Sequence, residues 1–468
     1  MNGEGAVILD FLMRIGSKRE VIKYLATFSE IDPHKFAIIK VSGSCIEQYS
    51  KPLCDDLYTL NTLGLYPTVI FGWGNKVTCE MEKRGLESRF HTDGNRITTP
   101  DTLNVIKDVV KEFTGILVEG MREADRDSSF HGHGNCVQDL TRIPIFYGRR
   151  TENSDLGLVG EIERVDTGPI LDAIKSERIP ILVPLCYDDE SNQILNVNAD
   201  TAARMLFRAL DPVKYISLTE TGGICDAQNH LIAEINLRND LERILSSGCV
   251  TGGMLKKLKE AEYLLKGLLP EKSVQITSPK QLLYELFTNR GAGTIIKQGY
   301  DILTYASSDG LDTDKMKEVM ESALKKHLLD DFFTNPRFKP DKVILESGYK
   351  GGMFIQRRDD AWYIDKIFVA PKSQNNGLSA ELFQELFKQA EKAGITRLFW
   401  RAKTTNEFND SYTKTIWSKN DSNSLIIPDG EFIYYFIGIP VEEVQKYKQI
   451  AKTKPYSFKE DYEALIVS

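Results

Sequence analysis

The stretch Gln374-Asn375-Asn376-Gly377-Leu378-Ser379 joins a strand-like segment to a helix-like segment. Residues 362–369 predict a strand because apolar and aromatic side chains dominate them. After the stretch, apolar residues recur at helical spacing on one face: Leu378, Leu382, Phe383, Leu386, Phe387 and Ala390. The start of a helix has free backbone N–H groups at its positive end, and these suit a diphosphate. The stretch therefore predicts an anion-binding loop where a strand passes into a helix.

Composition limits the classes of protein to consider. The chain has 468 residues, which predicts two or three domains, and its net charge of −8 argues against nucleic acid as the main partner. No run of about 18 apolar residues is present, so we expect no membrane span. Seven scattered cysteines without a C-x-x-C pair suit a reducing compartment, and the N-terminal residues resemble neither a secretory signal nor a transit peptide. These features predict a cytoplasmic protein with no membrane partner.

The first part of the chain has an α/β pattern. We expect N-terminal helices over 1–30 and an α/β domain over 31–300, because buried-strand runs alternate there with helical patterns. The expected strands are 36–41, 68–71, 181–185, 213–218 and 274–277, and helical patterns lie at 199–210 and 253–265. Such alternation predicts a mostly parallel sheet with helices on both faces.

The second part has an α+β pattern with antiparallel-looking strands. Residues 298–310 are the expected linker, and the second domain is expected over 312–468. Its expected strands are 342–346, 352–357, 362–369, 397–401 and 431–437.

Several strand ends of the first domain carry residues that suit phosphate chemistry. Lys40 ends a strand, glycines such as Gly43 and Gly72 follow strands, and Lys257 lies one turn inside a helix. Asn196 and Asp200 lead into another helix. Phosphoryl transfer needs cations around spread negative charge together with close backbone amides. Taken singly, each feature also fits a solvated lysine, a turn or a helix cap.

Together these residues resemble the amino-acid kinase fold, and the N-acetylglutamate kinase branch in particular, over about residues 20–300. The resemblance implies that Lys40 and Lys257 stabilise the transferring phosphoryl group and that Asp200 organises the two lysines. It implies that Arg96 and Asn196 hold N-acetylglutamate, and that Gly43 and Gly72 approach the phosphates of MgATP. An arginine suits a carboxylate because it donates two parallel hydrogen bonds.

The kinase pattern has departures. The family usually shows a His-Gly-small-Gly loop, where this chain has Phe71-Gly72-Trp73-Gly74. Trp73 either obstructs the phosphate path or packs elsewhere. Some relatives keep this fold as a regulatory domain without kinase activity, whereas the retained lysines and Asp200 favour activity.

The second domain resembles the vertebrate-type N-acetylglutamate synthase domain, a GNAT acetyltransferase fold fused behind an amino-acid kinase domain. The resemblance covers about residues 312–440 and implies that Lys366 and Arg401 bind the carboxylates of glutamate while Asn406 orients it. Tyr412 is implied to assist the leaving thiolate or the amine. The acetyl-CoA diphosphate is assigned to the initial stretch, with Gln374, Gly377 and Ser379 as its contacts.

This second pattern also has departures. Relatives often carry Gln-Gly-x-Gly-x-Gly, where this chain has Asn375 and Ser379 at two of the glycine positions. Lys366 and Arg401 could alternatively be partners of surface acids.

Two further motifs have competing interpretations. His131-Gly132-His133 is a weak metal pattern and more typical of a polar loop, so no metal site is assigned. Residues 289–294 resemble a loop that lies near an arginine pocket in arginine-sensitive relatives, or they form a plain glycine-rich turn.

The sequence thus predicts an enzyme of arginine biosynthesis that acetylates L-glutamate with acetyl-CoA and phosphorylates N-acetylglutamate with MgATP. L-arginine is an expected effector and a homo-oligomer is the expected assembly. The alternatives are a synthase with a non-catalytic kinase-like domain, and an arginine or nucleotide sensor whose sites have decayed.

Overall fold

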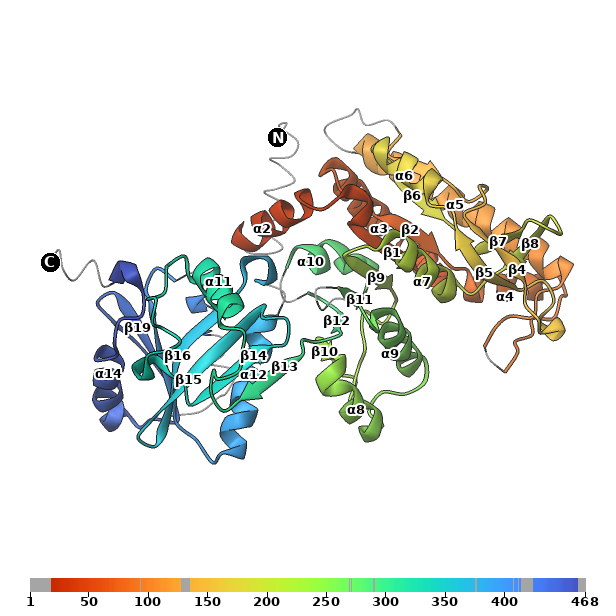
Figure 1. Cartoon of the computed structure of the whole chain (residues 1–468). Helices are drawn as coiled ribbons and strands as arrows, with labels where there is room; N and C mark the ends of the chain where they lie inside the picture. Colours follow the sequence, from red (N-terminus) through yellow and green to blue (C-terminus); the bar gives the residue numbers. More distant parts are fainter. Residues whose placement is uncertain are drawn as a thin grey trace. The chain divides into compact units, whose positions relative to one another are not determined.

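The computed structural model divides the chain into two compact units, Met1–Gln298 and Gly299–Ser468 (Figure 1). It describes residues 18–92, 94–127, 135–268, 270, 272–288, 291–374, 377–406, 408–410, 412–413 and 424–461. The N-terminal helical prediction is met in part by α2 (Lys18–Ser29), and its earlier residues lie outside the described ones.

The first unit is built on an eight-stranded sheet with the order β10-β12-β11-β9-β1-β2-β6-β3. All neighbouring strands are parallel except β11 and β12. The strands are β1 (Ala37–Val41), β2 (Thr68–Phe71), β3 (Val137–Asp139), β6 (Ile179–Leu182), β9 (Lys214–Leu218), β10 (Glu234–Asn236), β11 (Ser273–Thr277) and β12 (Thr294–Lys297). This sheet confirms the predicted mostly parallel architecture.

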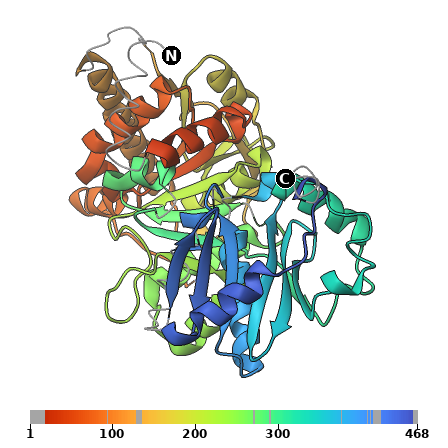
Figure 2. The same ribbon diagram turned by 90° about the vertical axis from the view of Figure 1, so that its left-hand side faces the viewer.

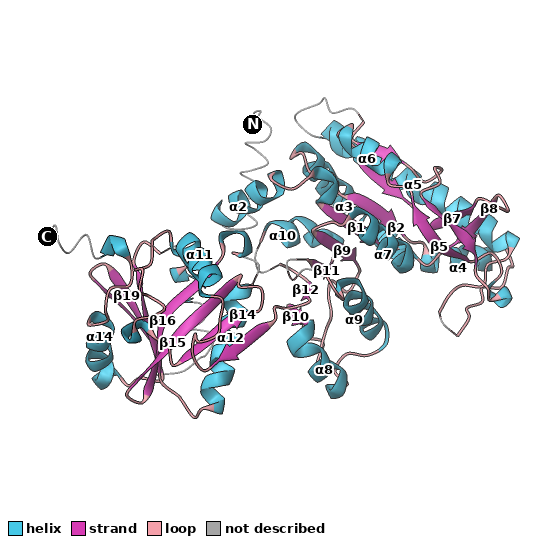
Figure 3. Cartoon of the chain, in the orientation of Figure 1, coloured by secondary structure: helices cyan, strands magenta, loops and turns pink. Residues whose placement is uncertain are grey.

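Helices cover both faces of this sheet, because the apolar cluster on each face contains helix residues; Figure 3 shows these helices in cyan and the strands in magenta. One apolar cluster includes Ile39 and Val41 of β1, and the other includes Ile38, because successive side chains of a strand point to opposite faces. The first cluster contains residues of α2, α3 (Gly43–Thr62), α4 (Gly74–Lys83), α5 (Pro100–Asp127) and α10 (Leu282–Phe287). The second contains residues of α6 (Gly168–Lys175), α7 (Ala199–Leu210), α8 (Leu237–Ser247) and α9 (Gly252–Leu265).

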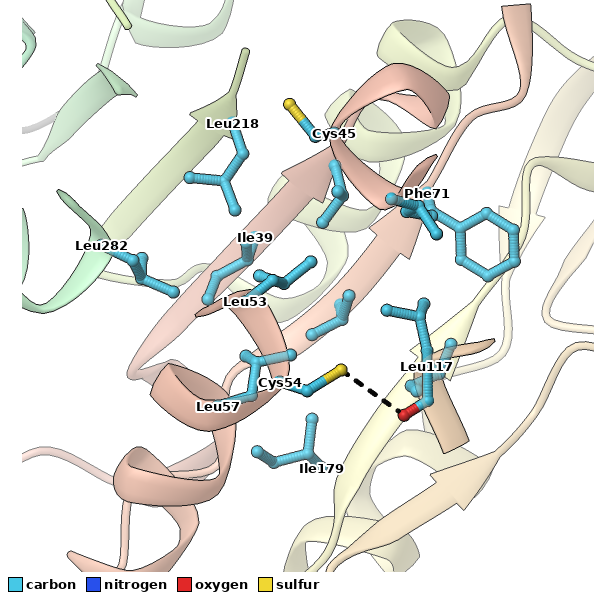
Figure 4. Close-up of a cluster of buried hydrophobic side chains, with 14 of the residues drawn as sticks. Ile39, Cys45, Leu53, Cys54, Leu57, Phe71, Leu117, Ile179, Leu218 and Leu282 are labelled. Carbon is cyan, nitrogen blue, oxygen red and sulfur yellow. Dashed lines mark hydrogen bonds between the residues drawn. The ribbon is translucent and has the colours of Figure 1, made fainter. Parts of the chain in front are cut away.

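Figure 4 shows the first cluster, where side chains of α3 such as Leu53 and Leu57 face Ile39 of the sheet. The Cys54 thiol donates to the carbonyl oxygen of Leu117 at 3.7 Å. This packing holds the second half of α3 against the sheet, and the helix itself begins at Gly43, two residues after β1 ends at Val41.

The single strand predicted at 181–185 is wrong. Residues 181 and 182 end β6 in the large sheet, whereas Leu185 begins β7 (Leu185–Asp188) in a separate four-stranded sheet. Pro184 lies between the two strands and has no N–H to continue the first ladder. The small sheet has the order β5-β4-β7-β8 and its other strands are β4 (Phe146–Arg150), β5 (Gly160–Val165) and β8 (Gln193–Asn196).

The second unit is built on a seven-stranded sheet with the order β13-β14-β15-β16-β17-β19-β18. Its strands are β13 (Ile302–Tyr305), β14 (Lys342–Glu346), β15 (Gly351–Arg358), β16 (Ala361–Val369), β17 (Leu398–Lys403), β18 (Leu425–Asp429) and β19 (Phe432–Ile437). The linker prediction for 298–310 is wrong in part, because β13 lies inside that range and pairs with β14.

The two central strands of this sheet, β16 and β17, are parallel and pair at only two positions, Trp362↔Leu398 and Tyr363↔Phe399. The rest of each strand continues without a mutual ladder, so the sheet opens between them. Helix α12 (Leu378–Lys392) covers one face of the opening, and α11 (Thr313–Leu324) and α14 (Val444–Lys452) contribute to clusters on the other. Figure 2 shows α14, in dark blue, lying across the strands.

Candidate active sites

Two glycine loops meet at the carboxyl ends of β1 and β2. The Gly72 N–H donates to the Val41 carbonyl at 3.0 Å, and a Cβ added to Gly43 would lie 3.0 Å from the Gly72 carbonyl oxygen. A Cβ on Gly72 would lie 3.0 Å from the Cβ of Ala199. A side chain at Gly43 would therefore press on the other loop, and one at Gly72 would press on the start of α7, which explains why glycine suits both positions.

The charged groups predicted for phosphoryl transfer lie together at these loops. Lys40 Nζ is 2.7 Å from Asp200 Oδ1, and their side chains are 13% and 30% exposed. Burial disfavours the charged form of Lys40, but the charge and hydrogen bond of Asp200 outweigh it and raise the pKa of the lysine. Burial and the like charge of Lys40 lower the pKa of Lys257. Lys40, Asp200 and Lys257 thus form one electrostatic group.

Two adjoining cavities share this group. One of about 190 Å³ is lined by Asp200, Lys256, Lys257, Glu260 and Tyr215 among others. The other is lined by the loop residues and the predicted substrate contacts, including Lys40, Gly43, Gly72, Arg96, Asn196 and Asp200. Asp200 lies on both cavities, so a donor in one and an acceptor in the other would meet at the lysines.

The second cavity holds both predicted contacts to N-acetylglutamate. Asn196 is buried and its Nδ2 donates to Thr98 Oγ1 at 2.9 Å. The Arg96 guanidinium, also buried, donates to the Gly74 carbonyl at 2.8 Å and to Thr78 Oγ1 at 2.9 Å. Arg96 is therefore held at the edge of the cavity by protein groups. The cap of α7 is Asn198, whose Oδ1 accepts from the Asp200 N–H at 2.8 Å.

Trp73 packs into the core. It is 6% exposed and belongs to the apolar cluster under α3 and α5. Its backbone forms the N-cap of α4. Its burial favours packing, and Trp73 also lines the second cavity beside Gly72, so the structure does not decide between the two interpretations.

The loop predicted to bind an anion in the second unit ends at Gly377, the N-cap of α12, which has a φ of 92°. That left-handed conformation favours glycine, and glycine has no side chain to cap the first-turn amides. Gln374 Nε2 donates to the Val369 carbonyl at 3.1 Å, which ties the loop to the end of β16. Ser379 lies in the first turn and is partly exposed. Asn375 and Asn376 lie outside the described residues.

Tyr412 lies on the α12 face of the sheet. It is 5% exposed, and its ring lies 5.9 Å from Phe383 of α12 and 6.1 Å from Trp400 of β17. Burial raises the pKa of Tyr412 well above its usual value, although a hydrogen bond with the Asn406 side chain opposes this shift. The phenol is therefore protonated at neutral pH and can donate a hydrogen bond.

Lys366 lies on a β-bulge of β16. The register shifts between Phe354 and Ile355, so Asp365 is the extra residue and its side chain reaches the same side as Lys366. Lys366 Nζ is 2.6 Å from Asp365 Oδ2, and both side chains are buried. Burial lowers the pKa of Lys366 to about 8, even though the charge of Asp365 raises it. Lys366 does pair with an acid, but the acid is buried rather than on the surface.

Arg401 lies on the same side of the sheet as Lys366. Its guanidinium lies 4.4 Å from the ring centroid of Phe432. Burial and Asp365 raise the pKa of Tyr363, and the charges of Arg401 and Lys366 oppose this, so both cations lie near that ring. Along β17, Trp400 and Ala402 belong to the α12 cluster and Phe399 to the α14 cluster, which places Arg401 on the α14 side. The structure thus brings the predicted residues together as two pairs, on opposite faces.

The sequence interpretation missed three charged residues in these sites. Lys454 Nζ lies 2.9 Å from Asp365 Oδ1 and shares that carboxylate with Lys366. Glu260 lines the cavity with Asp200, and burial and the charge of Asp200 raise its pKa to about 7. The sequence could have indicated Glu260, because it lies three residues after Lys257 and this spacing places both side chains on one face of a helix. No local signal indicated Lys454 or the role of Asp365.

The predicted arginine loop encloses a buried carboxylate. Glu285 is 1% exposed, and its Oε2 accepts from the Ala292 and Gly293 N–H groups at 2.7 and 3.0 Å. Its Oε1 has no hydrogen-bond partner among the described residues. The charge of Glu285 also acts on buried Lys214, whose pKa burial lowers to about 8. Asn289 and Arg290 of this loop lie outside the described residues.

Within the described ranges, no group of three or more His, Cys, Asp and Glu side chains forms a metal cage. The motif His131-Gly132-His133 lies outside those ranges. The described helices include none that has both the length and the apolar character of a membrane span.

Residues 35–276 match the model of the amino acid kinase family. The chain belongs to the amino acid kinase family. Residues 303–454 match a second model, the N-acetyltransferase domain of N-acetylglutamate synthase. The predicted fusion of an amino-acid kinase domain with a GNAT-type acetyltransferase domain is thereby confirmed.

Relatives have one or both parts. Acetylglutamate kinase of Xanthomonas campestris is 31% identical over 85% of this chain and 90% of its own length. Protein ARG5,6, mitochondrial, of Candida albicans is 29% identical over 94% of this chain and 50% of its own length. The solved N-acetylglutamate synthase of Neisseria gonorrhoeae in complex with coenzyme A and N-acetylglutamate covers 93% of this chain and 96% of its own, with a TM-score of 0.63 and 17% identity. That likeness concerns the fold.

Proposed function

We propose that this protein transfers an acetyl group from acetyl-CoA to L-glutamate and phosphorylates N-acetylglutamate with MgATP, both in arginine biosynthesis. The observation that carries the proposal is the presence, on one chain, of the Lys40–Asp200–Lys257 group between two cavities and of the Tyr412 and Lys366 pairs around the opening of a GNAT-type sheet. The relatives' names point to the same pair of activities.

For phosphoryl transfer, the chain supplies positive charge and backbone amides. Lys40 and Lys257 neutralise charge that spreads over the moving phosphoryl group, and Asp200 holds Lys40 in place. Arg96 and Asn196 bind the acceptor. Mg²⁺ on the nucleotide would screen the phosphate charge, and the carboxylates of Asp200 and Glu260 in the shared cavity suit such an ion.

For acetyl transfer, the amine of glutamate attacks the thioester carbon directly. The C–N bond forms, the C–S bond breaks, and the amine loses its proton to solvent or a base. Tyr412, which is protonated at neutral pH, donates a hydrogen bond to the departing thiolate and stabilises the charge that develops there, and the thiolate takes its proton from solvent. Lys366 and Arg401 bind the two carboxylates, and the first-turn amides of α12, with Gln374, Gly377 and Ser379, bind the diphosphate of the cofactor.

The two halves of the acetyl-transfer site lie on opposite faces of the sheet, so glutamate and the thioester would meet where β16 and β17 separate. An opening of the sheet at this point makes such a meeting possible.

Two further parts of the proposal concern regulation and location. We assign L-arginine, as effector, to the loop around Glu285, because a buried carboxylate whose Oε1 has no hydrogen-bond partner among the described residues suits a guanidinium. The compartment is proposed to be the cytoplasm, although the names of three fungal relatives include the word mitochondrial.

Separate assays of the purified full chain test the proposal. We expect coenzyme A release that depends on L-glutamate, and ADP release that depends on N-acetylglutamate. Acetyl transfer without phosphoryl transfer would favour a synthase with a kinase-like regulatory domain. Binding of arginine or nucleotide with neither activity would favour the sensor.

A further inference from the structure

The second unit brings more positive than negative charge together beside Tyr363, and the side chains of Lys366 and Asp365 there are buried. Lys366 and Lys454 share the single carboxylate of Asp365, at 2.6 and 2.9 Å. Arg401 adds a third cation on the same face of the sheet, two residues after Phe399, the ladder partner of Tyr363. Counting these four groups, two positive charges remain in excess.

Both carboxylate oxygens of Asp365 are paired with a lysine: Oδ2 with Lys366 and Oδ1 with Lys454. Charges from both lysines outweigh burial and hold the pKa of Asp365 far below its usual value, so it stays ionised and is no general base. Among the residues that the structure describes, neither lysine pairs with a carboxylate of its own. A buried cation without its own counter-ion is costly, and a bound anion relieves that cost.

The surroundings limit screening by water. Lys366 Nζ lies 5.6 and 5.5 Å from the ring centroids of Phe332 and Phe458, and Lys454 Nζ lies 5.7 Å from that of Tyr363. In such an apolar setting a charge acts more strongly on its neighbours than it does in water. The site therefore responds to the number of charges on its ligand.

We propose that Lys454 is a positioning residue that makes this site selective for amino acids with a second carboxylate. It takes Asp365 Oδ1 and so leaves Lys366 with charge to offer a substrate carboxylate. The inference rests on the proposed acetyl transfer to glutamate and names the feature of that substrate which the site distinguishes.

Substitution Lys454→Met in the full chain tests the inference, with L-glutamate and L-glutamine as acceptors. Glutamine keeps the size of glutamate but lacks the second charge. We expect kcat/KM for glutamate to fall about tenfold, mostly through KM, as loss of one charged contact typically causes. The value for glutamine should change less than about twofold, so the preference for glutamate falls about tenfold.

Two variants serve as controls. Lys454→Arg keeps the charge and should restore the preference. Lys446→Met removes a lysine of α14 that pairs with Asp359 at 2.8 Å and is half exposed, so it should leave both acceptors unchanged. A merely structural role of Lys454 would lower the rates with glutamate and glutamine alike.

The pH dependence gives a second signature. Lys366 has a lowered pKa of about 8, first through burial and in part through the charge of Lys454, while Asp365 and Tyr363 on its own strand oppose the shift. Glutamate KM should therefore rise as the pH passes about 8 and Lys366 loses its proton. In Lys454→Met this rise should move to higher pH, because a repelling charge is gone.

The inference is overturned if Lys454→Met keeps the wild-type preference for glutamate and the wild-type pH profile. Lys454→Gln, which keeps a polar end, replaces the methionine variant if the latter does not fold. If the wild-type chain acetylates no amino acid, the proposed function fails, and the site is then judged by thermal unfolding. Glutarate should stabilise the wild type more than butyrate does, and Lys454→Gln should lose that difference; equal stabilisation by both would refute the dicarboxylate site.

Discussion

Substitution Asp200→Asn tests whether the first unit is a kinase. The change keeps the shape of the side chain and removes the charge that Lys40 Nζ meets at 2.7 Å. Lys40 and Lys257 then lose the carboxylate between them and repel one another more strongly, since the charge of Lys40 already lowers the pKa of Lys257, and Glu260 is the acid that remains in the same cavity. We expect the lysines to move apart and the rate of phosphoryl transfer to fall.

The structure sets the size of two effects. Breaking a buried ion pair costs about 3–5 kcal/mol, and because Asp200 is 30% exposed we expect about 1–3 kcal/mol of lost stability. Loss of one preorganised group that stabilises a transition state lowers kcat about 10²- to 10³-fold. Acetyl transfer should stay within about twofold of wild type, because its site is formed by residues of the other unit.

The assay follows ADP release, coenzyme A release and thermal unfolding on the same preparation. Asp211→Asn is the matched control, since Asp211 also pairs with a largely buried lysine, Lys272, away from the two cavities. Asparagine suits its left-handed φ of 51°. Asp200→Asn with phosphoryl transfer within threefold of wild type, or with a loss no larger than that of Asp211→Asn, would refute the assigned role.

Three further substitutions test other positions. Tyr412→Phe should lower kcat for acetyl transfer at least about tenfold and leave acetyl-CoA affinity nearly unchanged in a binding titration, because only the hydrogen-bond donor to the thiolate is lost; unchanged turnover would remove Tyr412 from the mechanism. Gly377→Ala should weaken acetyl-CoA binding and lower stability by about 1 kcal/mol, because a φ of 92° strains a residue with a Cβ; calorimetry that shows wild-type affinity would contradict the loop assignment. Trp73→Ala should cost about 3–5 kcal/mol of unfolding free energy by chemical denaturation, as expected for a buried aromatic; a stable variant with increased ADP release would instead support obstruction of the phosphate path.

The kinase site was largely predictable because its parts follow a topological rule. Parallel strands carry their carboxyl ends to one edge, so Lys40 at the end of β1 and Gly72 after β2 had to be neighbours once the α/β pattern was recognised. Asp200 lies 160 positions from Lys40 in the sequence, and the order of elements together with the resemblance placed it correctly against the lysine. The prediction of a single strand over 181–185 was wrong because this one apolar run contains the end of β6 and the start of β7, which belong to different sheets.

The acetyl-transfer site was less predictable because it depends on a bulge. In a regular strand, neighbouring residues point to opposite faces, so Asp365 and Lys366 should not meet. The register shift opposite Phe354 and Ile355 brings them together, and the sequence 363–367 contains no glycine that would indicate it. Lys454 joins from a segment 89 residues away, through an ion pair that local patterns cannot indicate.

The arrangement on two faces changes what the predicted pairs imply for catalysis. Had Lys366, Arg401, Asn406 and Tyr412 surrounded one cavity, substrate binding and stabilisation of the thiolate would be coupled through direct contact. Instead, Tyr412 packs with Phe383 and Trp400 under α12, while Arg401 faces Phe432 on the other side of the same strands. The β16–β17 ladder ends at Tyr363 and Phe399, and the opening beyond it is where groups on the two faces can reach one another. Substitutions on the face that carries Lys366 and Arg401 should therefore change the KM for glutamate. Substitutions on the α12 face, which carries Tyr412, should change kcat or the affinity for acetyl-CoA.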